Sequence, residues 1–309
     1  MTSRIKRLKM TSALISAVLA GGLLGSDAWA HVPSNPEAVG NVRALTASSN
    51  LVIHGKVTRV DYRMSEPGAN GSQGIPYTFV TYSITKALRG TAPGSRITLR
   101  FVGGPDGRGG FVEVESVPKF KVGDEDVLFV AENGEEGCAL VMCDFGRYRI
   151  LDGGVYEGHG APVVAVNGNR IVKGPGQGPA ELDTFRYPAP TFDEMLKNSA
   201  FAAAVRGTGG SLAQARARYN AGAPQFIEIG VGSSSAAGPR AKTPARGLAA
   251  DAFLSAVEDA VAKAPRGVTK ALRSAQVNAP LAVPTIVEAA PKGLRRGTVV
   301  SPGKVIRKD

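Results

Sequence analysis

Apolar side chains recur at every second position along much of the chain between residues 51 and 173, and this alternation constrains the fold more than any other feature. In the run 77–88, for example, Val80, Tyr82 and Ile84 fall on one face of an extended chain. Such a pattern is typical of half-buried strands in an antiparallel sheet. Asn167-Gly168 favours a tight hairpin, and the spacing of the turns is typical of a small barrel or sandwich. We expect strands over residues 51–62, 77–88, 97–102, 127–131, 139–143, 147–151, 162–166 and 170–173.

Short helices are expected on both sides of this β-rich region. Residues 36–49 place Val39, Val42 and Leu45 at helical spacing. Thr191 and Glu194 have the spacing of a capping box and predict the start of a second helix. We therefore predict a mainly β fold with short flanking helices.

The first thirty residues have the pattern of a signal peptide. Basic residues precede an apolar stretch over residues 13–24, and Ala28-Trp29-Ala30 resembles a peptidase cleavage site. Twelve apolar residues are fewer than the ~20 that a membrane-spanning helix needs. We predict cleavage after residue 30, a mature chain that starts at His31, and export to the periplasm or the extracellular space. The basic residues are Arg4, Lys6, Arg7 and Lys9.

Positive charge is concentrated beyond residue 199. Residues 31–199 carry 17 Lys and Arg against 19 Asp and Glu, a net charge of −2, whereas residues 200–309 carry 16 against 6, a net charge of +10. The second region is rich in Ala, Gly, Pro and Ser, a composition typical of flexible segments. We predict a folded domain over 31–199 and a largely disordered basic extension over 200–309.

The charge distribution limits the partners that we expect. A nucleic-acid-binding module needs positive charge on its folded surface, which the body lacks, so no nucleic acid is expected. The basic extension would be attracted to an anionic envelope polymer or to lipid head groups. A solvated extension without a partner is the alternative. No second apolar segment of membrane-spanning length follows the signal peptide.

One helix is predicted within the extension, over residues 248–264. Its apolar residues recur at intervals of three or four, and Pro265 ends the pattern. The polar face carries Asp251, Glu258 and Asp259, which an anionic membrane would repel. We therefore expect this helix to dock on the body. Its apolar positions are Ala250, Leu254, Val257, Val261 and Ala264.

Several runs within residues 37–196 resemble a group of exported bacterial proteins that contain a compact β-barrel. These runs are NLVIHGKVTRV, YTFVTYSITKALRG, PGSRITLRFVGG, PKFKVGDEDVLFV and GRYRIL. The barrel of that group is similar in outline to the oligonucleotide/oligosaccharide-binding (OB) fold and to the netrin-like module. The resemblance implies export and a small antiparallel OB-like β-barrel over 31–199, but no catalytic residue. Netrin-like tissue inhibitors of metalloproteases chelate zinc through an amino-terminal cysteine, a position that His31 occupies here.

Cys138 and Cys143 are the only cysteines. In an exported protein an even number of cysteines favours a disulfide, here one that closes a short loop. Without nearby histidines the pair is a poor zinc site.

The three histidines suggest one metal hypothesis. An amino-terminal His31 would offer its amine and its ring nitrogen together, an arrangement used by copper-binding monooxygenases and periplasmic copper carriers. The second ligand would have to be His54 or His159, and neither belongs to a recognisable copper pattern.

Catalytic motifs are missing from the sequence. It contains no G-x-S-x-G, H-E-x-x-H or C-x-x-C motif, and Glu113 and Glu115 are typical of a solvated strand face. The glycine-rich run 103–110 is interpreted as a mobile barrel loop, and 124–126 as a turn that enters a strand. We expect an exported, non-enzymatic binding or structural module of the envelope or extracellular space, without a cofactor. The alternatives are a copper-binding redox protein that uses His31 and a secreted protease inhibitor.

Overall fold

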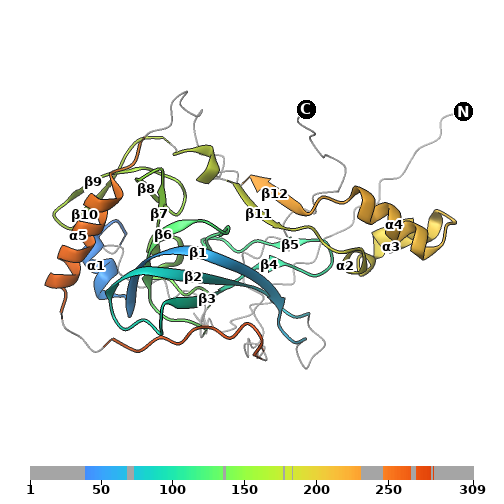
Figure 1. Ribbon diagram of the computed structural model, residues 1–309, viewed down its shortest axis with the longest axis horizontal. Coiled ribbons are helices and arrows are strands. Elements are labelled where there is room, and N and C mark those ends of the chain that lie inside the picture. Colours follow the sequence, from blue (N-terminus) through green and yellow to red (C-terminus); the bar gives the residue numbers. More distant parts are fainter. Residues whose placement is uncertain are drawn as a thin grey trace, which may run out of the picture. The chain divides into compact units, whose positions relative to one another are not determined.

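The computed structural model describes residues 39–67, 73–134, 137–176, 178–182, 184–230, 246–265, 269–279 and 281. The expected signal peptide and His31 lie outside these ranges. A six-stranded antiparallel sheet forms the centre of the fold (Figure 1). In spatial order its strands are β3 (Arg96–Val102), β2 (Pro76–Arg89), β1 (Leu51–Met64), β6 (Glu125–Val130), β7 (Arg147–Leu151) and β8 (Gly154–Glu157).

Three two-stranded sheets and several helices surround this central sheet. The small sheets pair β4 (Gly104–Pro105) with β5 (Phe111–Val112), β9 (Val163–Asn167) with β10 (Arg170–Lys173), and β11 (Thr184–Pro188) with β12 (Phe226–Gly230). The helices are α1 (Val42–Ala47), α2 (Phe192–Leu196), α3 (Ser199–Gly207), α4 (Leu212–Gly222) and α5 (Ala250–Lys263), with short 3-10 turns η2 (Cys143–Gly146) and η3 (Ala180–Leu182). The mainly β, antiparallel fold with short helices is therefore confirmed.

The closed barrel that the sequence predicts is not found in the part of the chain that the structure describes. The central sheet begins at β3 and ends at β8, and other segments of the chain cover both edges. Beside β3, the Ala275 amide donates a hydrogen bond to the Thr98 carbonyl at 2.8 Å, and beside β8 the Val155 amide donates to the Leu248 carbonyl at 2.9 Å. Because these contacts satisfy backbone groups that an open sheet would otherwise expose, the sheet needs no closure into a barrel.

The alternating side chains of the central sheet divide between two cores. Leu51 and Ile53 are buried on one face, in a core that also contains Phe101 and Phe120. Val52 lies on the other face, in a core that includes α1 and α5. A strand buried on both faces explains why β1 begins with a continuous apolar run.

Two local expectations are modified by backbone conformation. Residues 139–143 do not form a strand: Leu140 makes a single bridge to Val130, and Met142 and Cys143 have φ values of +51° and +56°, outside the strand region. The expected hairpin joins β9 to β10, but its two-residue loop starts at Gly168, whose φ of +60° suits a glycine at the first loop position.

Helix α5 confirms the helix predicted over 248–264. Phe253, Val257 and Ala260 on its apolar face are buried in the second core. On its polar face, Glu258 forms an ion pair of 2.6 Å with Lys86 of β2. The helix lies next to α1 (Figure 1) and docks on the body, as its acidic face led us to expect.

Other parts of the expected extension also contact the body. β12 pairs with β11, and Leu272, in the segment 269–279, is buried in the first core. Helices α3 and α4, in contrast, have no buried residue. Residues 231–245 and 282–309 lie outside the described ranges, and the domain boundary at residue 199 stays a prediction. None of the helices in the described ranges has the length and apolarity to cross a bilayer.

Candidate functional site

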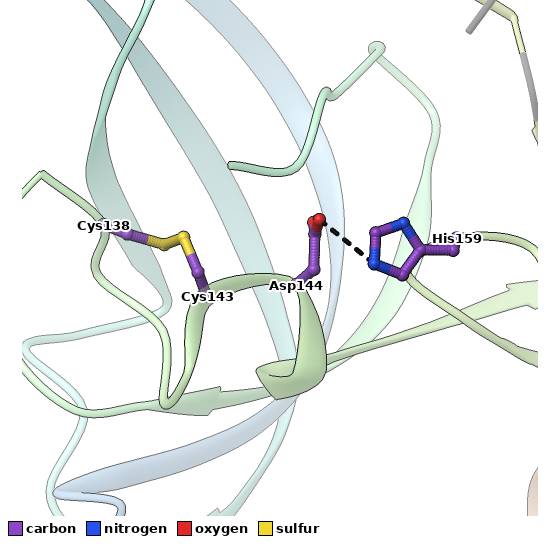
Figure 2. Close-up of a disulfide and its surroundings, with 4 residues drawn as sticks. All are labelled: Cys138, Cys143, Asp144 and His159. Carbon is purple, nitrogen blue, oxygen red and sulfur yellow. Dashed lines mark ion pairs between the residues drawn. A yellow bond between two sulfur atoms is a disulfide. The ribbon is translucent and has the colours of Figure 1, made fainter. Parts of the chain in front are cut away.

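Cys138 and Cys143 form the disulfide that the sequence predicts, with an S–S distance of 2.07 Å and a Cα–Cα distance of 5.7 Å. The bridge closes the turn before η2, and the next residue, Asp144, extends toward His159 (Figure 2). Asp144 Oδ2 lies 3.4 Å from His159 Nε2, with the carboxylate buried and the imidazole 60% exposed. Burial raises the pKa of Asp144 to about 6, although the positive charges of His159, Arg147 and Lys119 oppose the shift.

The two candidate histidines in the described ranges bind different carboxylates. His54 Nε2 of β1 lies 2.7 Å from Glu125 Oε1 of β6, whereas His159 pairs with Asp144. Within the described ranges no group of three or more His, Cys, Asp or Glu residues is placed to hold a metal ion. Since His31 lies outside these ranges, the copper hypothesis stays a prediction.

The acidic turn 124–126 contributes to a buried ionic network that the sequence did not reveal. The Arg147 guanidinium donates to Asp124 Oδ2 at 2.8 Å and to Asp126 Oδ1 at 2.9 Å, and all three side chains are buried. The Tyr82 hydroxyl donates to Asp126 Oδ2 at 2.7 Å. Burial alone would raise the pKa of Asp124, but Arg147 and Arg149 outweigh it and lower this pKa below its usual value. The network holds β6 and β7 together and is fully enclosed, so we assign it a structural role.

A groove of about 350 Å³ brings polar and apolar groups together at the surface of the described residues. Three segments that are far apart in sequence form it: the end of β1, the loop after β4, and the connection from β11 into α2. The residues that line it are Val60, Asp61, Tyr62, Pro105, Gly107, Gly109, Gly110, Tyr187, Pro188, Ala189, Pro190, Thr191 and Glu194.

The loop after β4 is ordered by its own aspartate. Asp106 Oδ1 accepts hydrogen bonds from the amides of Arg108 and Gly110, both at 2.8 Å. Gly109 has a φ of +88°, and a Cβ there would collide with Met195 of α2. The glycine-rich run, interpreted from the sequence as a mobile barrel loop, forms one wall of the groove, with Gly109 against Met195 of α2.

Tyr62 and Tyr187 are the aromatic residues in the lining of the groove. Tyr187 of β11 packs 4.9 Å from Phe111 of β5 and 6.0 Å from Phe185, as measured between ring centroids. Burial, followed by the influence of Tyr187, raises the pKa of Tyr62 to about 12, and burial followed by the charge of Asp106 raises the pKa of Tyr187. Both hydroxyls are therefore protonated near neutral pH and are hydrogen-bond donors.

Both carboxylates that line the groove already have partners. Asp61 forms an ion pair with Arg59, with an Nε–Oδ2 distance of 2.7 Å. Glu194 Oε2 accepts from the amide and the hydroxyl of Thr191 at 2.7 and 2.9 Å, which confirms the predicted capping box. These partners fix the carboxylates in place, and among the described residues they leave Asp61 Oδ2 buried without a hydrogen bond, while the bonds from Thr191 involve only Oε2 of Glu194.

Residues beyond position 199 support the α2 side of the groove. The Tyr219 hydroxyl of α4 donates to the Pro190 carbonyl at 2.7 Å, and Arg216 binds Asp193 at 2.6 Å. The rings of Phe192, Phe201 and Tyr219 lie 5.7–5.8 Å apart. The lining itself ends at Glu194, and residues from the region that composition assigned to the extension support it from outside.

No protein-family model matches the chain, and no curated protein matches it. The function is therefore argued from the geometry and chemistry of the groove.

Proposed function

We propose that this chain is an exported, non-enzymatic binding module whose ligand site is the groove formed by β1, the loop after β4 and α2. The observation that carries the proposal is the lining of the groove, in which tyrosine and proline rings form the walls. Rings of this kind offer a large contact area and lose little side-chain entropy when a ligand binds. A volume of about 350 Å³ falls in the range typical of ligand sites.

The chemistry of the lining favours binding over catalysis. The lining residues include no Ser, Cys, Lys or His that would be a nucleophile or a base near neutral pH. The two carboxylates, Asp61 and Glu194, are held by Arg59 and by the capping box. A general base must reach a proton of the substrate. Arg59 and the capping box compete with a substrate for contact with these carboxylates.

Two features support the proposed export. The N-terminal residues have the charge and apolar pattern of a signal peptide. The Cys138–Cys143 disulfide is a linkage that persists in oxidising compartments.

Filling the groove tests the proposal. Ala189→Trp would place an indole among the lining residues without removing a charge or a hydrogen-bonding side chain, and Ala204→Trp on the exposed surface of α3 is its matched control. Mature protein and both variants would be screened on arrays of peptides and envelope saccharides. We expect at least one ligand that binds the wild type and Ala204→Trp but not Ala189→Trp. If no ligand shows this dependence, the groove is not a binding site and the proposal fails.

We also propose that the basic C-terminal region tethers the body to an anionic envelope component. The net charge of +10 over residues 200–309, against −2 over residues 31–199, supports this role. The two proposals are independent, because the groove selects a ligand whereas the basic region determines where the protein accumulates.

A further inference from the structure

The hydrogen-bonding groups of the groove are unequally available. Among the described residues, the hydroxyls of Tyr62 and Tyr187 form no hydrogen bond with another residue, so both are free to donate to a ligand. The Ala189 amide, in contrast, already donates to the Gln225 carbonyl at 3.0 Å, and the Gly110 amide donates to Asp106. A complementary ligand therefore presents acceptors to the two hydroxyls and does not depend on these backbone amides.

The groove also carries uncompensated negative charge. Asp106, at the base of the loop, and Glu194, in the lining, accept hydrogen bonds from neutral groups, and within the described ranges neither forms an ion pair. Their charges raise the pKa of Tyr187 and of Tyr219, after the larger effect of burial. Arg59 is paired with Asp61, whereas Asp106 and the exposed Arg108 both lie on the loop after β4, outside the lining itself.

We infer that the groove binds a proline-rich peptide segment that carries Lys or Arg. This inference rests on the proposed function and specifies its ligand class. A polyproline II segment presents backbone carbonyl acceptors, has no internal hydrogen bonds, and loses N–H donors at each proline. Such a segment suits a site with free hydroxyl donors, and its rings would pack on the ring walls of the groove. A basic side chain in the same peptide complements Asp106 and Glu194.

Two other ligand classes fit less well. A peptide that adds a strand needs free backbone amides and carbonyls at a sheet edge, and the Ala189 and Gly110 amides are occupied. A saccharide presents many hydroxyl groups that donate as well as accept, but a neutral saccharide carries no positive charge that would complement Asp106 and Glu194. Saccharide binding is therefore one of the outcomes that the experiment below distinguishes.

Three synthetic decapeptides separate the contributions of proline and of charge. The first repeats Pro-Pro-Arg, the second replaces each arginine with glutamine, and the third replaces each proline with alanine. Binding to the full mature protein would be measured by fluorescence anisotropy, together with a fluorescent chito-oligosaccharide. We expect the first peptide to bind at least tenfold more tightly than either of the others, with an affinity that falls as salt concentration rises.

Matched variants connect this preference to the groove. Tyr62→Phe removes a hydroxyl donor and is expected to weaken binding about three- to tenfold, whereas Tyr156→Phe, outside the groove, leaves it unchanged. Glu194→Gln keeps a residue type that forms a capping box but removes the charge, and Asp106→Asn keeps the acceptor oxygen. Together they are expected to abolish the preference for the arginine peptide over the glutamine peptide, and Glu115→Gln on the exposed surface is their control.

The outcomes separate the two proposals. Failure of the Pro-Pro-Arg peptide to bind, or binding that Ala189→Trp leaves intact, overturns the inference. If the saccharide alone binds and Ala189→Trp abolishes that binding, the peptide inference is wrong while the groove remains a binding site. Equal binding of the proline and alanine peptides would show that the site recognises charge alone, which also overturns it.

Discussion

The ring of Phe253 in α5 packs 4.9 Å from the ring of Tyr148 in β7, so a helix from the basic C-terminal region completes a core of the central sheet. Phe253 is fully buried, although Ala- and Gly-rich sequence surrounds its helix. The body and the C-terminal region therefore share a core, and we expect part of this region to stabilise the fold.

Phe253→Ala is expected to lower the free energy of unfolding by about 3–5 kcal/mol, because it leaves a cavity between α5 and the sheet. Phe226→Ala is the matched control, since Phe226 is 55% exposed and its loss creates no enclosed cavity. Urea unfolding followed by circular dichroism measures both. Equal, small losses for the two variants would show that α5 contributes little to the core.

The buried Arg147 gives a second prediction about stability. Arg147→Met leaves Asp124 and Asp126 buried without their main cation, which is expected to cost about 3–5 kcal/mol. Arg186→Met breaks an exposed ion pair with Glu228, 2.8 Å long, and is expected to cost about 1 kcal/mol or less. The two midpoints of chemical denaturation are compared. The structural role that we assign to the network is wrong if both arginine variants have the same stability.

The raised pKa of Asp144 predicts that the stability depends on pH. The folded state binds a proton at this carboxyl with a pKa of about 6, whereas the usual value is 3.8. Between pH 4 and pH 6 the folded state therefore holds more protons than the unfolded state, so this group's contribution to stability falls as pH rises, by about 2–3 kcal/mol.

Asp144→Asn removes this titration and is expected to flatten the fall in stability between pH 4 and pH 6. Asp152→Asn is the control, because Asp152 is exposed in the turn before β8. Thermal unfolding at half-unit pH steps measures the difference between each variant and the wild type. A pH dependence that is unchanged in Asp144→Asn would contradict the assigned pKa.

The parts of this molecule that the sequence predicted are those with a local pattern. Alternating side chains identified β1 and β2, three-or-four spacing identified α5, and the isolated cysteine pair identified the disulfide. The open sheet was not predicted, because its edges are covered by segments distant in sequence from the strands they cover. β12 was missed because its few residues lie within a region whose composition favours flexibility.

The groove and the ionic network had no local signal. Arg147 lies more than twenty residues from both of its aspartates, and no spacing rule connects them. Tyr62 lies in β1 and Tyr187 in β11, far apart in sequence. They line one groove only because the chain returns toward the end of β1 after β10 and η3. Such sites depend on tertiary contacts, which periodicity and composition do not encode.

The charge of the C-terminal region gives the last prediction. Residues 282–309 carry six basic and two acidic residues, and a variant with glutamine at all six basic positions tests their role without altering the described helices and strands. Wild-type protein is expected to sediment with phosphatidylglycerol vesicles at low salt and to dissociate as ionic strength rises, because exposed charges are screened beyond a Debye length of ~8 Å near 0.15 M. The glutamine variant is expected to remain in the supernatant, as wild-type protein would with neutral phosphatidylcholine vesicles.

A control variant exchanges Lys and Arg at the same positions, keeps the charge, and should behave as the wild type. If the glutamine variant sediments like the wild type at every salt concentration, these residues have no tethering role. The positions are Lys292, Arg295, Arg296, Lys304, Arg307 and Lys308.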